Sequence, residues 1–305
     1  MSARLLLLCP GQGGQHEGMN DSARLDSAAA AFLDRQQLAP GALFDNRVAQ
    51  PAVVAATLAV WIALQPRLTA VGMRPALVAG YSIGELAAYG VAGAIDADRC
   101  VALAHTRARL MDGAAAGAAQ TLCAISGVPL ARSAMLAAAA GFAIAIVNGH
   151  DSCISGGPLA ALAGLQQQVE RAGGRLQHLP VTVAAHTPLL AAAVAPFARA
   201  LAATPFAAPH TTLLCGIDAS RNAGAVATVH ARACSVLSRQ LAETIQWADC
   251  MDAAAEAGIT VALELGPGAA LARMLQTRQP GIACRSVSEF RSIDGVLAWL
   301  ERALV

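Results

Sequence analysis

The sequence contains no lysine, no C-x-x-C pair and no long hydrophobic run, and each absence argues against a class of protein. All 21 basic residues are arginines, none of them in a basic cluster, and the net charge is +1. A nucleic-acid-binding surface is therefore not expected. The eight cysteines are scattered along the chain, which favours free buried thiols over a disulfide framework or a metal site.

Apolar residues are abundant, but they are interrupted too often to predict a membrane span. The chain is 56% hydrophobic with a mean hydropathy of +0.50, yet Gly, Pro and charged residues break up its alanine-rich stretches. A membrane-spanning helix needs about 20 consecutive apolar residues, and the run at residues 5–8 is too short for a signal peptide. We therefore expect a cytoplasmic protein that does not bind membranes.

The stretch of residues 76–89 combines a short apolar run with a G-x-S-x-G pattern formed by Gly80, Ser82 and Gly84. Helix-forming residues follow directly, which is typical of a nucleophile elbow between a strand and a helix. The free N–H groups at the start of such a helix can stabilise an oxyanion. The pattern alone leaves two interpretations open: an active-site serine, or an ordinary strand–helix turn with Ser82 as the N-cap.

The order of apolar segments predicts an α/β fold with two parts. A length of 305 residues permits a large domain that carries an inserted smaller one. We expect a large α/β-hydrolase-like domain with a parallel sheet from residues 1–120 and 190–305. Residues 121–189 show the β-α-β-β-α-β order of a small ferredoxin-like subdomain. Residues 20–50 are expected to be irregular, followed by a helix at 51–64 with Pro51 at its first position.

Further strands and helices of the large domain are expected where apolar segments recur. The strands fall at residues 4–9, 76–79, 211–217, 259–265 and 282–287, and the helices at 96–112, 189–203, 225–241, 247–257 and 293–304. Glycine-rich turns follow the first two of these strands, at the carboxyl edge where open α/β sheets bind their ligands.

Two further residues have positions that suggest chemistry. A serine nucleophile needs a base, and His186 follows the last strand of the expected small subdomain, at the junction of the two parts, where sites often lie. Arg107 falls on the apolar stripe of the helix at 96–112, and a buried guanidinium requires an anion. His186 as a structural histidine, and Arg107 paired with an internal carboxylate, are the alternatives.

Seven short segments occur in one order along nearly the whole chain: PGQGGQ at 10–15, GYSIGE at 80–85, R-x-x-x-M at 107–111, AAH at 184–186, RQL at 239–241, IQW at 245–247 and GPG at 266–268. Together they resemble the malonyl-CoA:acyl carrier protein transacylase family. The match of several motifs in order is far more specific than the elbow alone.

The resemblance implies roles for five residues around the elbow. Ser82 would be the nucleophile that accepts the acyl group, and His186 would be its base. The main-chain carbonyl of Gln240, rather than an Asp, would orient the histidine. The backbone amides of Gln12 and Ile83 would form the oxyanion hole.

The resemblance also implies the substrate and the partners. Arg107 would bind the free carboxylate of a malonyl group, while Gln50 and Asn148 would line the pocket. The malonyl group would pass from coenzyme A to the serine, and then to the thiol of an acyl carrier protein's phosphopantetheine-type arm. No metal and no bound cofactor would be needed.

Two positions depart from the usual family pattern. Tyr81 replaces a His before the nucleophile, and Gly14 replaces a Ser. With these departures the chain is most similar to malonate decarboxylase epsilon subunits, which load the decarboxylase's own carrier subunit. A malonyl loader of fatty-acid or polyketide synthesis, a serine hydrolase of thioesters and a non-catalytic scaffold are the alternatives.

Overall fold

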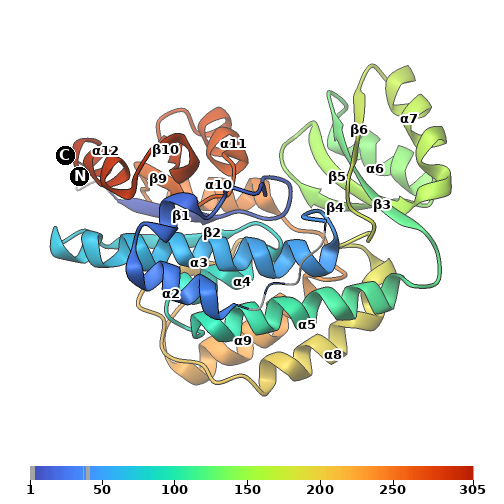
Figure 1. Cartoon of the computed structure of the whole chain (residues 1–305). Coiled ribbons are helices and arrows are strands. Elements are labelled where there is room, and N and C mark those ends of the chain that lie inside the picture. Colours follow the sequence, from blue (N-terminus) through green and yellow to red (C-terminus); the bar gives the residue numbers. More distant parts are fainter. Residues whose placement is uncertain (1–3, 37, 39–41, 305) are drawn as a thin grey trace.

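The computed structural model describes residues 4–36, 38 and 42–304, and a six-stranded sheet runs through the larger part of the molecule (Figure 1). In pairing order its strands are β10 (Ala283–Ser286), β9 (Val261–Glu264), β1 (Leu5–Cys9), β2 (Pro75–Gly80), β7 (Thr212–Leu214) and β8 (Arg221–Asn222). All neighbours are parallel except β7 and β8. Every residue of β1 is buried, as expected for a central strand covered on both faces.

Helices cover both faces of this sheet. In Figure 1, α10 and α11 lie above it, while α3, α5, α8 and α9 lie below it. The helices are α1 (Asp21–Arg24), α2 (Ser27–Arg35), α3 (Asn46–Ala70), α4 (Ile83–Val91), α5 (Ala97–Ala115), α8 (Ala191–Ala202), α9 (Val226–Arg239), α10 (Trp247–Glu256), α11 (Ala270–Arg278) and α12 (Ile293–Ala303), with short 3-10 turns η2 (Pro188–Leu190) and η3 (Val287–Glu289).

A second, antiparallel sheet forms the smaller part, drawn in green and yellow in Figure 1. Its strands pair in the order β4 (Ala143–Val147), β5 (Ser152–Pro158), β3 (Gln120–Ser126) and β6 (Arg175–Leu179), and its helices are α6 (Leu130–Ala139), η1 (Leu159–Ala161) and α7 (Leu162–Arg171). These elements enclose an apolar cluster of their own. The predicted fold class, an α/β protein with a parallel sheet and a ferredoxin-like subdomain, is confirmed.

The segment that follows α9 connects the two sheets. The N–H of Val147 in β4 donates to the carbonyl of Ile245 at 2.8 Å, and the N–H of Ile245 donates back to Ala145 at 2.9 Å. The next N–H, of Gln246, donates to Gly216 just beyond β7 at 2.7 Å. Residues 240–246 are therefore held against both parts of the molecule.

The expectation of irregular structure at residues 20–50 is wrong. The side chain of Asp26 accepts from the N–H groups of Ala28 and Ala29 and caps α2, a local N-cap that alanine-rich residues then extend. Helix α3 begins at Asn46, so Pro51 is not at its first position. Asn46 Nδ2 donates to Asp112 Oδ1 at 2.7 Å on α5, a tertiary contact that the local sequence does not reveal.

Helix α3 also differs from the expectation that no segment resembles a membrane span. By length and composition it is apolar enough to cross a membrane, with a mean hydropathy of 1.6 over 18 residues. However, 83% of that window is buried inside the protein, where the helix packs against α2, α4 and α5. We therefore interpret α3 as the central core helix of the large domain.

Candidate active site

Ser82 lies in a sharp turn between β2 and α4. Its backbone has φ +55° and ψ −121°, a conformation that costs a non-glycine residue of the order of 1–3 kcal/mol. A Cβ at Gly84 would lie 2.1 Å from the carbonyl oxygen of Cys9, and one at Gly80 would lie 2.3 Å from the backbone of Glu85. Ser82 stands at the N-cap position of α4, but its side chain makes no capping bond. The turn is therefore a strained elbow whose two glycines permit close backbone contact.

The side chain of Ser82 faces His186. Ser82 Oγ lies 2.7 Å from His186 Nε2, and His186 Nδ1 lies 2.5 Å from the main-chain oxygen of Gln240. Because a carbonyl only accepts hydrogen bonds, Nδ1 carries the proton and Nε2 is free to accept the serine proton. Burial, with the nearby Arg107 charge adding to it, lowers the pKa of His186 to about 3. The imidazole is thus neutral and oriented as a base.

Arg107 lies on α5 and is only 2% exposed. Its Nη1 donates to Gln50 Oε1 at 2.7 Å, and its Nη2 donates to Gln240 Oε1 at 3.4 Å. Gln50 belongs to α3 rather than to a segment before the helix. Burial lowers the pKa of Arg107 to about 9, although the charge of Glu85 opposes the shift. Within the described residues no carboxylate forms an ion pair with this cation, so its direct partners are two neutral amides.

A cavity of about 380 Å³ opens between the two parts, and both Ser82 and His186 line it. Gln12 and Asn148 also line it, together with apolar side chains of the small sheet such as Leu122. Its size falls within the range of small-molecule sites. Among the residues described, Gln50, Arg107 and Gln240 are not part of the lining. All three are buried, and Gln240 contacts His186 directly.

Two backbone amides near the elbow lack partners in the described part of the chain. Ile83 is the first residue of α4, and the first N–H groups of a helix have no intrahelical acceptor. Gln12 lies in the glycine-rich turn after β1, which neighbours β2 in the sheet. Neither amide donates to another described group. Both are therefore available to an oxyanion, as expected for this edge of a parallel sheet.

The structure also shows two polar residues that the sequence analysis left without a role. The Tyr81 hydroxyl donates to Asn148 Oδ1 at 3.2 Å, and its ring meets that of Trp247 edge-on at 5.3 Å. Glu85, in α4, accepts from Gln240 Nε2 at 2.5 Å. Both belong to the GYSIGE motif, so their position next to Ser82 in the sequence could have indicated that they lie near the site. Their partners lie far away in sequence.

The cysteines do not contribute to this site. All eight are free, and six of them are buried. Burial raises the pKa of Cys215 to about 12. Within the described residues no three His, Cys, Asp or Glu side chains form a group that could hold a metal ion.

The site resembles the active site of an acyl-transfer enzyme. It combines a strained serine, a neutral histidine held by a carbonyl, and backbone amides that are available to an oxyanion. The family model described as "Acyl transferase domain" matches residues 6–291. The chain is also 33% identical to the malonyl CoA-acyl carrier protein transacylase of Mycobacterium tuberculosis, over 95% of this chain and 98% of that protein. The chain belongs to the acyl transferase family.

Solved structures agree with this assignment. The crystal structure of MCAT from Mycobacterium tuberculosis is 31% identical and superposes with a TM-score of 0.86, over 95% of this chain and 98% of that one. A malonyl-transacylase solved with its type II PKS acyl-carrier protein is 23% identical, with a TM-score of 0.86 over 97% and 99% of the two chains. The second likeness shows the shared fold.

Proposed function

We propose that this chain transfers a malonyl group from malonyl-CoA to Ser82 and then to the thiol of a carrier protein. The observation that carries the proposal is the buried Arg107, which has no carboxylate partner among the described residues. It contacts Gln240, the residue whose main-chain oxygen also holds His186. An unpaired buried guanidinium is costly unless an anion joins it. The names of the relatives, malonyl CoA-acyl carrier protein transacylases, support the same substrate.

In the first half-reaction, Ser82 Oγ attacks the thioester carbonyl while His186 Nε2 takes its proton. The amides of Gln12 and Ile83 stabilise the oxyanion of the tetrahedral intermediate. This intermediate collapses with loss of the coenzyme A thiolate, which receives the proton from His186. A serine ester and free coenzyme A result.

In the second half-reaction the carrier's thiol attacks the serine ester. His186 removes the thiol proton and returns it to Ser82 Oγ as the ester bond breaks. The carrier leaves as a malonyl thioester, and the enzyme is restored without any cofactor. His186 therefore acts as base and acid in turn, which its neutral resting state permits.

Arg107 is proposed to bind the malonyl carboxylate. A guanidinium has five N–H donors. Two of them have partners, Gln50 and Gln240, which leaves enough donors for a bidentate contact with a carboxylate. Acetyl-CoA lacks this carboxylate, so Arg107 would select against it.

For the acceptor we propose the carrier subunit of malonate decarboxylase. Tyr81 and Gly14, which depart from the usual motifs, support this placement through the resemblance to epsilon subunits. The alternative is an ordinary carrier of fatty-acid or polyketide synthesis, which the names of the relatives favour. Transfer assays with both carriers decide between them, and a clear preference for the ordinary carrier would reject our choice.

Intact-mass spectrometry after incubation with malonyl-CoA tests the covalent step. We expect one malonyl adduct on the wild type and on a Ser126→Ala control, whose serine is exposed on β3, and none on Ser82→Ala. An adduct that survives Ser82→Ala would refute the mechanism. Rapid release of free malonate without a carrier would instead identify a hydrolase.

A further inference from the structure

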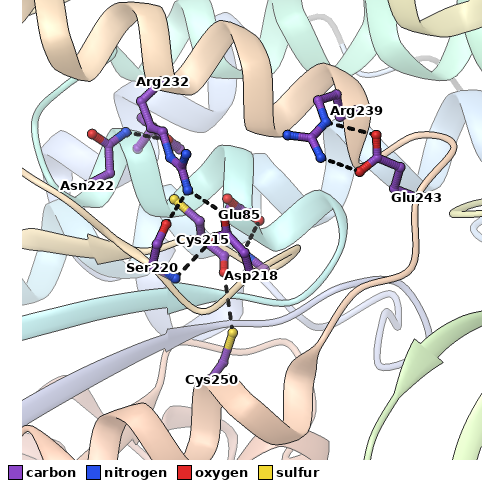
Figure 2. A network of polar contacts seen from close by, with 11 residues as sticks. Glu85, Cys215, Asp218, Ser220, Asn222, Arg232, Arg239, Glu243 and Cys250 are labelled. Carbon is purple, nitrogen blue, oxygen red and sulfur yellow. Dashed lines mark hydrogen bonds and ion pairs between the residues drawn. The ribbon is translucent and has the colours of Figure 1, made fainter.

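Glu85 is a buried acid to which the proposed reaction assigns no role. It is the third residue of α4, only 1% exposed, and lies beside the turn that follows β7 (Figure 2). Its Oε2 accepts from the N–H of Gly216 at 3.0 Å and from Gln240 Nε2 at 2.5 Å. Within the described residues its Oε1 has no partner. Burying a carboxyl group costs free energy unless hydrogen bonds compensate, which indicates that the contacts of Glu85 have a function.

The contact with Glu85 determines which way the Gln240 amide points. With Nε2 donating to Glu85, the other amide atom, Oε1, faces Arg107 Nη2 at 3.4 Å. The reversed amide would place an oxygen against the carboxyl oxygen and an NH2 group against the guanidinium. Both contacts would be repulsive. The amide therefore lies between an acid and a cation in the one orientation that satisfies both.

Gln240 also holds the catalytic base, through its backbone. Its main-chain oxygen accepts from His186 Nδ1 at 2.5 Å, and the N–H of His186 donates to Leu241 at 2.9 Å. A displacement of residue Gln240 as a whole would therefore move both the carbonyl that orients the histidine and the side-chain amide that contacts the arginine. Glu85, which contacts the Gln240 side chain, is 155 residues away from it in the sequence.

We propose that Glu85 is a positioning residue which, by anchoring Gln240, sets both the orientation of His186 toward Ser82 and the place of the Arg107 guanidinium. For Arg107 the inference rests on the proposed function, because it concerns malonyl selection. For His186 it concerns only the reactivity of the serine.

The anchor does not depend on the protonation state of Glu85. Burial, with a contribution from Asp218, raises its pKa to about 8, while Gly216, Arg107 and Gln240 oppose the shift. Oε2 already accepts two hydrogen bonds, so a bound proton would reside on Oε1, which has no partner in the described structure. Oε2 then accepts from Gln240 in either state.

The experiment compares Glu85→Met, which keeps the volume but removes the acceptor, with Glu85→Gln, which keeps an acceptor oxygen. Glu256→Ala, on the exposed end of α10, is the matched control. The rate at which a fluorophosphonate labels Ser82 reports the histidine without any malonyl group. The ratio of malonyl to acetyl transfer onto Ser82 then reports the arginine.

We expect Glu85→Met to lower the labelling rate by about 10- to 100-fold, the range for leaving a buried donor, here Gln240 Nε2, without its acceptor, and to reduce the malonyl-to-acetyl ratio. Glu85→Gln should stay within about threefold of the wild type in both readouts. Because Glu85 acts through Gln240, adding Glu85→Met to Gln240→Met should change neither readout by more than about threefold.

Independent, multiplicative effects of Glu85→Met and Gln240→Met would overturn the proposal. If Glu85→Met does not fold, Glu85→Gln decides: near-normal labelling supports the anchor, and a tenfold loss in a folded protein rejects it. A wild type that labels with the fluorophosphonate but takes no malonyl would reject the proposed substrate. The labelling series would still test the link between Glu85 and His186.

Discussion

Replacing Arg107 with Met is the most direct test of malonyl selection. The change removes the charge and its donors but keeps an apolar side chain of similar length in the buried stripe of α5. Within the described residues Arg107 donates hydrogen bonds to two neutral side-chain amides, those of Gln50 and Gln240. In the proposed reaction the malonyl carboxylate pairs with this charge, so the effect should fall on the substrate that carries that group.

The magnitude follows from the burial of the site. Breaking a buried ion pair by removing one partner costs about 3–5 kcal/mol, and each 1.36 kcal/mol is a tenfold change in rate. We therefore expect kcat/KM for malonyl-CoA to fall by about two to almost four orders of magnitude. Acetyl-CoA has no carboxylate, so its rate should stay constant or rise.

The assay measures the rate of acyl-serine formation from each thioester by quenched-flow mass spectrometry. Arg109→Met is the control, because Arg109 lies exposed two residues further along α5. A thermal melt confirms that each variant is folded. A folded Arg107→Met protein that kept the wild-type ratio of malonyl to acetyl transfer would refute the role of this residue.

Three further predictions follow from the elbow and its surroundings. The pKa of His186 is lowered to about 3, so the imidazole stays unprotonated as the pH falls through 6.5. The rate of serine labelling should therefore be constant from pH 8 to pH 5. A fall in the labelling rate centred near pH 6.5 would contradict this. Gly84→Ala would place a Cβ 2.1 Å from the carbonyl oxygen of Cys9, so chemical denaturation should show a loss of about 3 kcal/mol or more; a stability equal to the wild type would show that the elbow can relax. Tyr81→Phe loses the hydrogen bond to Asn148 but keeps the ring, so it should lower the free energy of unfolding by about 1 kcal/mol and Tm by about 2 °C. If Tyr81→Phe lowers the stability but Asn148→Ala does not, the contact between the two residues is not the cause.

Much of the fold could be predicted because strands and helices follow from neighbouring residues. The apolar run of residues 4–9 predicted β1, which the structure places at Leu5–Cys9. The alternation in the middle of the chain predicted the second sheet, since its strands and helices are separated by short turns. The same local reasoning failed for α1, α2 and the start of α3. In these segments an N-cap and tertiary contacts stabilise helices, although the polar composition predicted irregular structure.

The sequence by itself also indicated a sharp serine turn between a strand and a helix, because Gly80, Ser82 and Gly84 lie within five residues of each other. Helical periodicity over residues 96–112 also marked Arg107 as an unusual residue on an apolar stripe. Neither observation revealed what these groups contact. Their partners come from other segments, and local periodicity carries no information about which loops meet at the edge of a sheet.

Only the tertiary structure decided how those segments are joined. Parallel strands bring their carboxyl ends to one edge, and the segment at 240–246, held against both sheets, lies beside that edge. There Gln240 meets His186, Arg107 and Glu85 at once. Such contacts depend on the packing of the whole chain. The sequence predicted the candidate residues, and the packing decided that one glutamine contacts the histidine, the arginine and a buried acid.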